Sequence, residues 1–214
     1  MSVIALDASG TQAGLALLSK DGEILERWAA PLKPGLIETL PVMLQNAAAG
    51  REITDMAVGI GPGSFTGLRT SIALAQGFAA ASGATLWGIP AWDSYCAALP
   101  DLDRPLWIAI RARRGRLFLL RNHGTVEAFD EESLPTPQTA VAMAGEEAAF
   151  VAACLAGRGV DVTLTNVGPP DAGTVGLAAL AQKRAGSPPK LALPLYIDPP
   201  EAKLPAAGLR PAPL

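Results

Sequence analysis

The residues best placed to do chemistry form a glycine-rich run, GPGSFTGLR, at residues 61–69. It follows a short apolar stretch at 56–60 that predicts a strand, and it leads into an alanine-rich stretch at 68–82 whose apolar residues repeat at helical spacing. A glycine-rich turn between a strand and a helix can bind a phosphate group, because the free backbone N–H groups at the start of the helix attract anions. The first hypothesis for this loop is therefore phosphate binding.

The end of the loop argues against that hypothesis. A Walker phosphate loop needs Lys followed by Ser or Thr at the start of the helix, to reach the phosphates and the magnesium ion. Here the corresponding residues are Gly67, Leu68 and Arg69. We therefore favour a structural turn, in which Ser64 or Thr66 caps the helix and the glycines allow the backbone to pack closely.

Metal and thiol chemistry have few candidates. The chain has one histidine, His123, in a predicted hairpin turn, and a single histidine cannot supply an HxxxH pair of metal ligands. The two cysteines, Cys96 and Cys154, lie in apolar surroundings without CxxC spacing. We expect both to be buried, small hydrophobic side chains in a reducing compartment.

The elements that would position the loop follow from periodicity and turn residues. Asp21-Gly22 is a strong hairpin turn between two β-compatible runs. Strands are predicted over 3–6, 14–18, 23–28, 56–60 and 85–89, and helices over 36–48, 68–82 and 91–99. The order β-β-β-α-β-α, followed by another strand and helix, is that of an actin/hexokinase-like (ASKHA, RNase H-like) α/β lobe, a five-stranded mixed sheet with helices on its faces.

A second lobe is predicted after the Pro/Asp-rich stretch 100–105. Strands are expected over 106–110, 116–121 and 125–129, short helices over 139–144 and 148–155, and a last helix over 174–185. We therefore predict two lobes, each with a mixed sheet and flanking helices. The predicted divisions are an N-terminal lobe with partner-binding helices at 1–101, a smaller C-terminal α/β lobe at 102–190, and an extended Pro-rich tail at 191–214.

Within such a fold, Asp7 falls where an actin-like phosphotransferase has a metal-bridging carboxylate. The C-terminal half, however, has no clear second phosphate loop and no adenosine-binding glycine pair. We favour an ordinary role for Asp7, as a strand-end residue that accepts hydrogen bonds from nearby backbone amides. The alternative, an active ATP-dependent kinase of the actin fold acting on a small metabolite, requires ATP and magnesium binding by the isolated chain.

Composition and charge limit the classes of protein to which this chain can belong. Half of the 214 residues are hydrophobic and 17% are charged, which predicts a globular chain. The net charge of -3 disfavours tight nucleic-acid binding by this chain alone, because such binding depends on Lys and Arg neutralising phosphates. The nearest approach to a basic patch, Arg111 to Arg116, is interpreted as an exposed turn. No apolar run reaches membrane-spanning length and no signal sequence is apparent, so we expect a cytoplasmic protein.

The whole nonapeptide resembles the signature of the TsaB (YeaZ) family, and it occupies the family's position after the first helix and strand. This signature loop comprises Gly61, Pro62, Gly63, Ser64, Phe65, Thr66, Gly67, Leu68 and Arg69. Three other segments support the resemblance: 4–9 is similar to the family's opening, 109–118 to a divergent iDARrgEvY segment, and 194–203 to its closing PxYlRppdaK. The resemblance therefore covers nearly the full chain.

What the resemblance implies is a non-catalytic subunit in the formation of N6-threonylcarbamoyladenosine at position 37 of tRNA. TsaB-like proteins are related to the catalytic subunit TsaD and to glycoprotease-like proteins, but lack their active site. They bind and stabilise TsaD, and the pair works with the ATPase TsaE. We accordingly expect tRNA contact only through the complex, no intrinsic cofactor or metal, ATP or ADP only at the joint surface with the catalytic subunit, and homodimers when the chain is isolated.

The chain also departs from the family pattern. Lys33-Pro34-Gly35 replaces the usual His-Ser pair, and Arg111, Arg116 and Asp198 replace an Asp, a Glu and an Arg. The changes at Arg111, Arg116 and Asp198 reverse charges and are consistent with a co-adapted partner. None of them removes a residue that the prediction assigns to catalysis.

The partner surface is predicted from an excess of apolar side chains on two helices. The helix at 36–48 has a wide apolar stripe, and the helix at 68–82 has two stripes, more than contact with one sheet would bury. Either both stripes are internal, or another subunit covers one of them. We favour a helix-bundle interface with a homologous partner, formed by Leu36, Ile37, Leu40, Met43, Leu44, Ile72, Ala75, Phe78 and Ala79.

Overall fold

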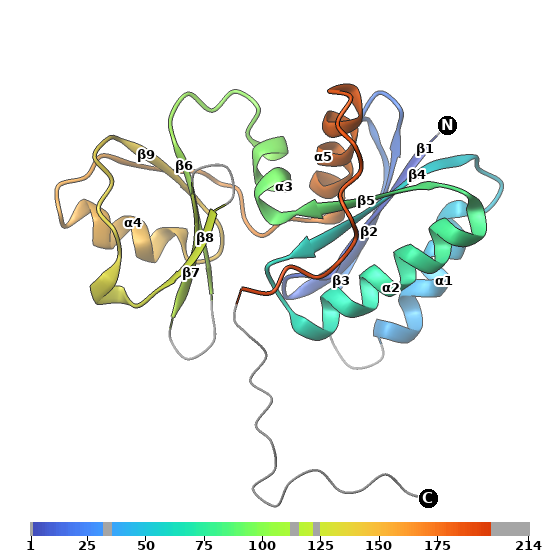
Figure 1. Ribbon diagram of the computed structural model, residues 1–214, viewed down its shortest axis with the longest axis horizontal. Helices are drawn as coiled ribbons and strands as arrows, with labels where there is room; N and C mark the ends of the chain where they lie inside the picture. The colour runs from blue at the N-terminus through green and yellow to red at the C-terminus, as the bar shows by residue number, and fades with distance from the viewer. Residues whose placement is uncertain (1, 32–35, 112–115, 122–124, 198–214) are drawn as a thin grey trace, which may run out of the picture.

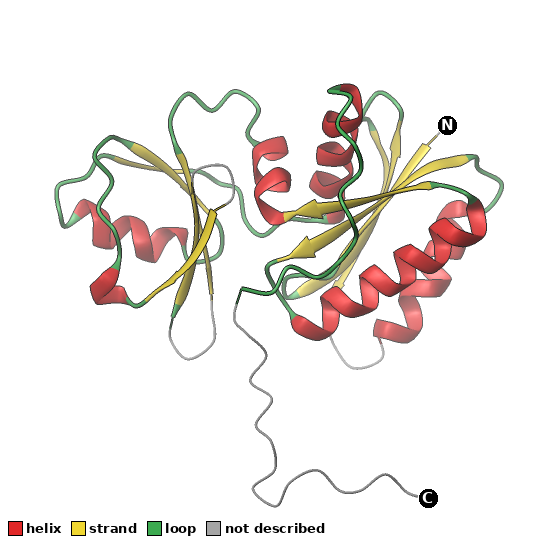
Figure 2. Cartoon of the chain, viewed as in Figure 1, coloured by secondary structure: helices red, strands yellow, loops and turns green. Residues whose placement is uncertain are grey.

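The computed structural model describes residues 2–31, 36–111, 116–121 and 125–197, with the side chains of 36–38, 125 and 131 excluded. Within these ranges the chain forms two lobes side by side, each built on a five-stranded sheet (Figure 1). Figure 2 shows that helices cover both faces of the larger, N-terminal sheet. This is the actin/hexokinase-like architecture expected from the sequence.

The first sheet has the strand order β3-β2-β1-β4-β5. The first three strands pair antiparallel, whereas β1–β4 and β4–β5 are parallel, so the sheet is mixed as predicted. Its strands are β1 (Ser2–Asp7), β2 (Gln12–Ser19), β3 (Ile24–Pro31), β4 (Ile53–Gly61) and β5 (Thr85–Pro90). Parallel β1 and β4 both end where the signature loop begins.

Two helices cover each face of this sheet. On one face, α1 (Leu36–Ala48) and α2 (Phe65–Ser82) lie next to each other and bury apolar side chains against β1, β2 and β4. On the other face lie α3 (Ala91–Ala98) and α5 (Ala172–Arg184). The small residues along α5 allow it to lie close to the strands, since a Cβ at Gly176 would collide with Leu18.

The second sheet has the order β10-β9-β6-β7-β8. Its strands are β6 (Leu106–Arg111), β7 (Leu117–Arg121), β8 (Thr125–Phe129), β9 (Val141–Ala144) and β10 (Val162–Leu164). Helix α4 (Ala148–Ala156) covers one face, and a short 3-10 turn, η2 (Glu131–Ser133), follows β8. Tyr95 and Ala91 of α3 pack on the other face, so α3 joins the two lobes.

The prediction for the C-terminal half was wrong in one element and missed another, the short strand β10. Residues 139–144 were expected to form a helix, but the segment contains β9, a buried parallel strand between β6 and β10. Four buried residues in succession are typical of a central parallel strand and also of a buried helix, so periodicity does not distinguish them. The helix at 148–155 was predicted correctly.

The chain returns to the first lobe after the second sheet. Helix α5 falls within 102–190, the range predicted for the second lobe, yet it packs on β1, β2 and β4 of the first sheet. Residues 187–197, which we call the strap, then cross the first lobe toward the signature loop (Figure 1). The first lobe is therefore formed by both ends of the described chain.

No helix among the described residues is long and apolar enough to span a lipid bilayer.

Candidate partner-binding surface

The signature loop is fastened by a helix cap. Helix α2 begins at Phe65, and the N-cap residue Ser64 accepts a hydrogen bond from the backbone N–H of Gly67 through its Oγ, at 3.3 Å. The backbone N–H of Leu68 also donates to the carbonyl of Ser64, at 2.9 Å. Capping by Ser64 confirms the structural interpretation of the loop, although the helix begins three residues before the predicted position of 68.

The glycines of the loop allow close backbone contact with the end of β1. A Cβ at Gly63 would collide with the carbonyl oxygen of Ser9, and a Cβ at Gly67 would collide with that of Ala8. The backbone N–H of Ser64 donates to the Ser9 carbonyl at 2.6 Å. Two amides that a phosphate cradle would use, those of Ser64 and Gly67, are therefore hydrogen-bonded within the chain. The loop fits packing better than phosphate binding.

Asp7 lies beside the loop and is almost entirely buried. Its Oδ2 accepts hydrogen bonds from the Ser9 N–H at 3.3 Å and from the Ser9 hydroxyl at 3.1 Å, and its side chain packs against Gly59. Burial raises the pKa of this carboxyl to about 7, more than the Ser9 hydrogen bonds lower it, and the negative charge of Asp171 adds to the rise. Asp7 is thus a strand-end residue bonded to a nearby amide, as favoured from the sequence.

The other side chains considered for metal or phosphate chemistry do not form a binding site among the described residues. Within the described ranges, no group of three or more His, Cys, Asp or Glu side chains is arranged to hold a metal ion. His123, like the Arg113 and Arg114 of the basic stretch, lies outside the described residues. Arg111 donates to Glu147 at 2.6 Å.

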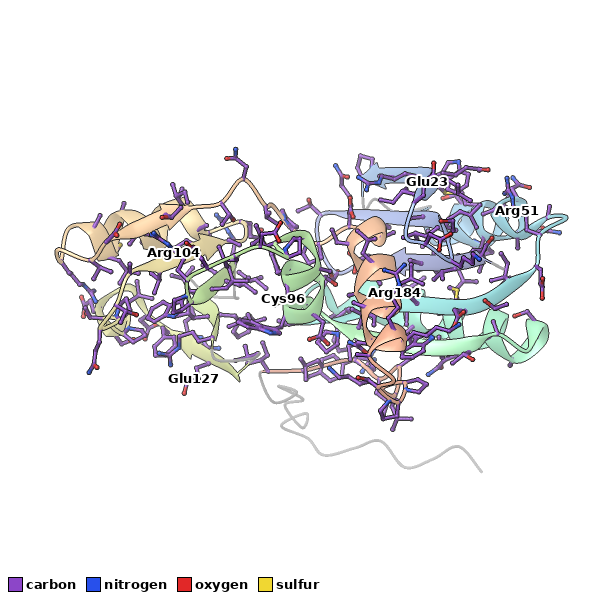
Figure 3. All side chains as sticks on the ribbon, turned by 90° about the horizontal axis from the view of Figure 1, so that it is seen from above. Glu23, Arg51, Cys96, Arg104, Glu127 and Arg184 are labelled. Carbon is purple, nitrogen blue, oxygen red and sulfur yellow. The ribbon has the colours of Figure 1, made fainter. Side chains whose placement is uncertain are left out.

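The expectation that both cysteines are buried was wrong. Cys96 is exposed on α3 (Figure 3) and Cys154 is partly buried on α4. Partial burial still raises the pKa of the Cys96 thiol, and the nearby Asp93 adds to this effect. A raised pKa makes the thiol less reactive at neutral pH.

An open, apolar groove with a volume of about 570 Å³ lies between α1 and α2 on the first lobe. Its lining comprises Pro41, Leu44, Gln45, Ala48 and Ala49 from α1 and the following turn, and Ala73, Leu74, Gly77 and Phe78 from α2. Small residues form much of this lining, and a Cβ at Gly77 would have open space around it. A third helix could therefore approach the groove closely.

The predicted interface residues divide into two groups. Leu40, Leu44, Ile72, Ala75 and Ala79 are buried in the core of the chain itself, at 0–8% exposure. Four of them cannot meet a partner unless the lobe opens, whereas Leu44 also borders the groove. These side chains lie on the face of each helix that packs against the sheet and the rest of the core.

A second apolar stripe of α2, which includes Leu74 and Phe78, is only partly covered. Phe78 lines the groove and is partly buried, and Leu74, one turn earlier, lies beside it. Met43 is partly buried on α1 but does not line the groove, and the side chains of Leu36 and Ile37 lie outside the described residues. Ala73 was expected from the sequence to let a partner helix approach closely, and it lines the groove. Ala48, Ala49 and Gly77 were missed, because small side chains contribute little to an apolar stripe.

A second exposed cluster lies at the other end of α2. The Arg69 guanidinium lies 3.8 Å from the centre of the Phe65 ring and 5.6 Å from that of the Tyr196 ring, and Arg69 Nε donates to the Tyr196 hydroxyl at 2.7 Å. Both rings are 44% exposed. This cluster connects the signature loop to the strap, and no pattern in the sequence predicted it.

Comparisons with known proteins give a consistent fold. YeaZ from Pseudomonas aeruginosa superposes with a TM-score of 0.68 at 21% identity, covering 92% of this chain and 100% of that one. A Pseudomonas aeruginosa protein described as similar to peptidase YeaZ gives 0.67 at 22% identity, covering 92% and 99%. A ROK family protein from Streptococcus pneumoniae, in complex with sucrose, gives 0.55 at 11% identity, covering 87% and 100%.

A search of curated proteins found no match. The family model described as TsaD, tRNA N6-adenosine threonylcarbamoyltransferase, matches residues 35–163, from α1 through β10. Because this match spans more than half of the 214 residues, the chain belongs to the TsaD family.

Proposed function

We propose that this chain is a TsaB-like, non-catalytic subunit that binds and stabilises a TsaD-like catalytic subunit in the synthesis of N6-threonylcarbamoyladenosine at position 37 of tRNA. Three observations support the assignment within the family. The nonapeptide at 61–69 resembles the TsaB signature, the TsaD family model covers most of the chain, and the fold resembles that of YeaZ over 92% of this chain and 100% of that one.

The groove between α1 and α2 is the observation that carries the proposal. It is apolar, lies on two helices and is lined by small residues, so it can accept a helix of another subunit at close distance. An open apolar surface of this kind costs free energy in water and is typical of an interaction site. A homologous partner would present its own helix pair, and the two pairs would pack as a bundle.

The state of the signature loop and of Asp7 supports a scaffold rather than a phosphotransferase. The loop amides of Ser64 and Gly67 are hydrogen-bonded within the chain, and the Asp7 carboxyl is buried with a pKa near 7. The Asp7 carboxylate already accepts hydrogen bonds from Ser9, and no group of three or more His, Cys, Asp or Glu side chains that could hold a metal lies among the described residues. We therefore assign no catalytic residue to this chain.

The remaining partners follow from the same proposal. A TsaE-like ATPase acts on the heterodimer, tRNA is contacted only through the complex, and any ATP or ADP binds at the surface shared with the catalytic subunit. Without that subunit, two copies of this chain cover each other's grooves in a homodimer. The cytoplasm is the proposed location, since tRNA is the substrate of the complex.

The proposal is tested by reconstituting tRNA threonylcarbamoylation from the TsaD-like subunit, the TsaE-like ATPase, the threonylcarbamoyl donor and this chain. Ala73→Glu places a charge in the groove on an exposed side chain and should abolish modification while the chain stays folded. The matched control is Ala153→Glu, at an exposed alanine on α4 of the second lobe, and it should keep wild-type activity.

Two results would contradict the proposal. One is full modification activity with Ala73→Glu, since the groove would then have no part in the complex. The other is phosphoryl transfer to a small metabolite by the isolated chain with ATP and magnesium, which would instead favour a kinase. Calorimetric titration of the isolated chain with magnesium-ATP measures the nucleotide binding that such a transfer requires.

A further inference from the structure

The strap, residues 187–197, is held on the first lobe mostly by hydrogen bonds. The backbone N–H of Gly88 in β5 donates to the Lys190 carbonyl at 3.0 Å, and the N–H of Leu195 donates to the Ile60 carbonyl of β4 at 2.8 Å. Between them, Gln76 Nε2 of α2 donates to the Ala192 carbonyl at 2.9 Å. The strap therefore contacts two strands and one helix that are distant from it in sequence.

Few of its side chains enter the core. Ala192 is buried among the apolar residues between α2 and the sheet, and a Cβ at Gly88 would lie 2.5 Å from the Leu191 carbonyl oxygen. In contrast, Leu191 and Leu193 are largely exposed, at 78% and 58%, and Leu195 is 39% exposed. A segment fixed by hydrogen bonds and one alanine can detach without unfolding the lobe, because little apolar surface is lost.

Near each end, an interaction of a charged side chain attaches the strap to a helix. Near its start, the Lys190 ammonium pairs with Asp93 of α3 at 2.7 Å. Near its end, Arg69 stacks on Phe65 and donates to the Tyr196 hydroxyl at 2.7 Å. The Arg69 contacts combine a hydrogen bond from a charged donor with a cation–π interaction, and these are the strong contacts of an otherwise exposed segment.

We propose that Arg69 is a latch that sets the equilibrium between a closed strap and an open one. In the closed state the end of the strap that contains Tyr196 is held on the start of α2, so the signature loop and the strap move as one unit. In the open state the N–H of Gly88 and the carbonyl of Ile60 lose their strap partners, and the site of Ala192 is uncovered. Arg69 acts here as a positioning residue, and the inference does not depend on the proposed function.

Hydrogen exchange of the full-length chain tests the latch. With Arg69→Ala, the backbone amides of Leu195 and Gly88 should exchange about tenfold faster, because the latch contacts no longer favour the closed state. Amides of the β6–β7 pair in the second sheet serve as an internal reference and should keep their rates. Trypsin should also cleave after Lys190 faster in the variant.

Two further variants identify the partner of Arg69. Tyr196→Phe removes the acceptor hydroxyl but keeps the ring, so the same amides should exchange faster by a smaller factor. The double variant should exchange no faster than Arg69→Ala alone, because both changes break the same contact. Arg184→Ala is the matched control, since Arg184 is an exposed arginine that donates to the Lys20 carbonyl outside the strap.

Unchanged exchange at Leu195 and Gly88 in Arg69→Ala would overturn the inference. So would equally faster exchange at β1 and throughout the first sheet, because Arg69 would then stabilise the whole lobe instead of the strap.

Discussion

At the scale of single residues, Asp7 is a side chain whose ionisation the fold changes strongly. Its pKa rises from an ordinary value of 3.8 to about 7, so the folded chain keeps a proton that the unfolded chain has released over that pH range. The destabilising effect of the carboxyl is absent below pH 3.8, grows as pH rises and is complete above pH 7.

Asp7→Asn removes this titration while keeping an acceptor for Ser9. From pH 5 to pH 8 the free energy of unfolding of the wild type should fall relative to that of the variant by about 2–3 kcal/mol, at roughly 1.4 kcal/mol per pKa unit. Urea unfolding of both proteins at the two pH values measures the difference. A constant difference between them would show that Asp7 does not titrate in this range.

Two glycines of α2 provide a matched pair at the same scale. Gly67→Ala should lower the free energy of unfolding by about 1–3 kcal/mol, because the added Cβ collides with the Ala8 carbonyl oxygen. Gly77→Ala should raise it by about 0.5–1 kcal/mol, because its Cβ meets open space and alanine is the better helix former. Thermal unfolding measures both, and equal effects of the same sign would contradict the close contact at Gly67.

At the scale of elements, α5 is tied to the first sheet by a buried carboxylate. Asp55 of β4 accepts hydrogen bonds from Lys183 Nζ at 2.5 Å, from Thr54 Oγ1 at 2.7 Å and from Trp87 Nε1 at 3.0 Å. Burial alone would raise the pKa of Asp55, but these three donors outweigh it and the pKa is lowered. The tie therefore stabilises the fold above the ordinary pKa of Asp55 and is lost as pH falls below it.

Lys183→Met should destabilise the chain by about 1–3 kcal/mol at pH 7, because it leaves the buried Asp55 without its cation. The loss should shrink as pH falls, because Asp55 without its cation takes up a proton at a higher pH than Asp55 in the wild type does. Arg184→Met, at the next residue on the exposed side of α5, is the control and should change stability little. Chemical unfolding at pH 7 and pH 3.5 gives the comparison, and a loss independent of pH would rule out the charge pair.

The elements themselves were largely predictable from local pattern. The antiparallel start, the helix at 36–48 and the parallel strands around the signature loop all follow from alternation, helical spacing and turn residues. β9 was mistaken for a helix, because a four-residue strand buried on both faces has no alternation. The return of α5 to the first sheet was not predictable, because it depends on contacts between residues more than 100 positions apart.

At the scale of the whole molecule, the candidate site was only partly predictable. The excess of apolar surface on α1 and α2 pointed to a partner, and the groove is where that excess stays uncovered. The sequence could not say which stripe faces the sheet, so Ile72 and Ala75 were assigned to the interface although both are buried. The contact between Arg69 and Tyr196 spans 127 positions and left no local signal.

The arrangement of the lobes is consistent with a subunit that binds through one face. α1 and α2 lie on the face of the first sheet opposite α3, which joins the second lobe, so the groove is open without interference from that lobe. The signature loop, the end of β1 and the strap meet at one end of α2. The groove can therefore take a partner while the internal packing of the lobe stays unchanged.

The most direct test of this account is calorimetric titration of the purified TsaD-like subunit with the wild type, Ala73→Glu and Ala153→Glu. The account predicts one-to-one binding for the wild type and Ala153→Glu, and at least a roughly 30-fold weaker affinity for Ala73→Glu, equivalent to about 2 kcal/mol. Equal affinity of all three chains, with Ala73→Glu folded, would contradict it.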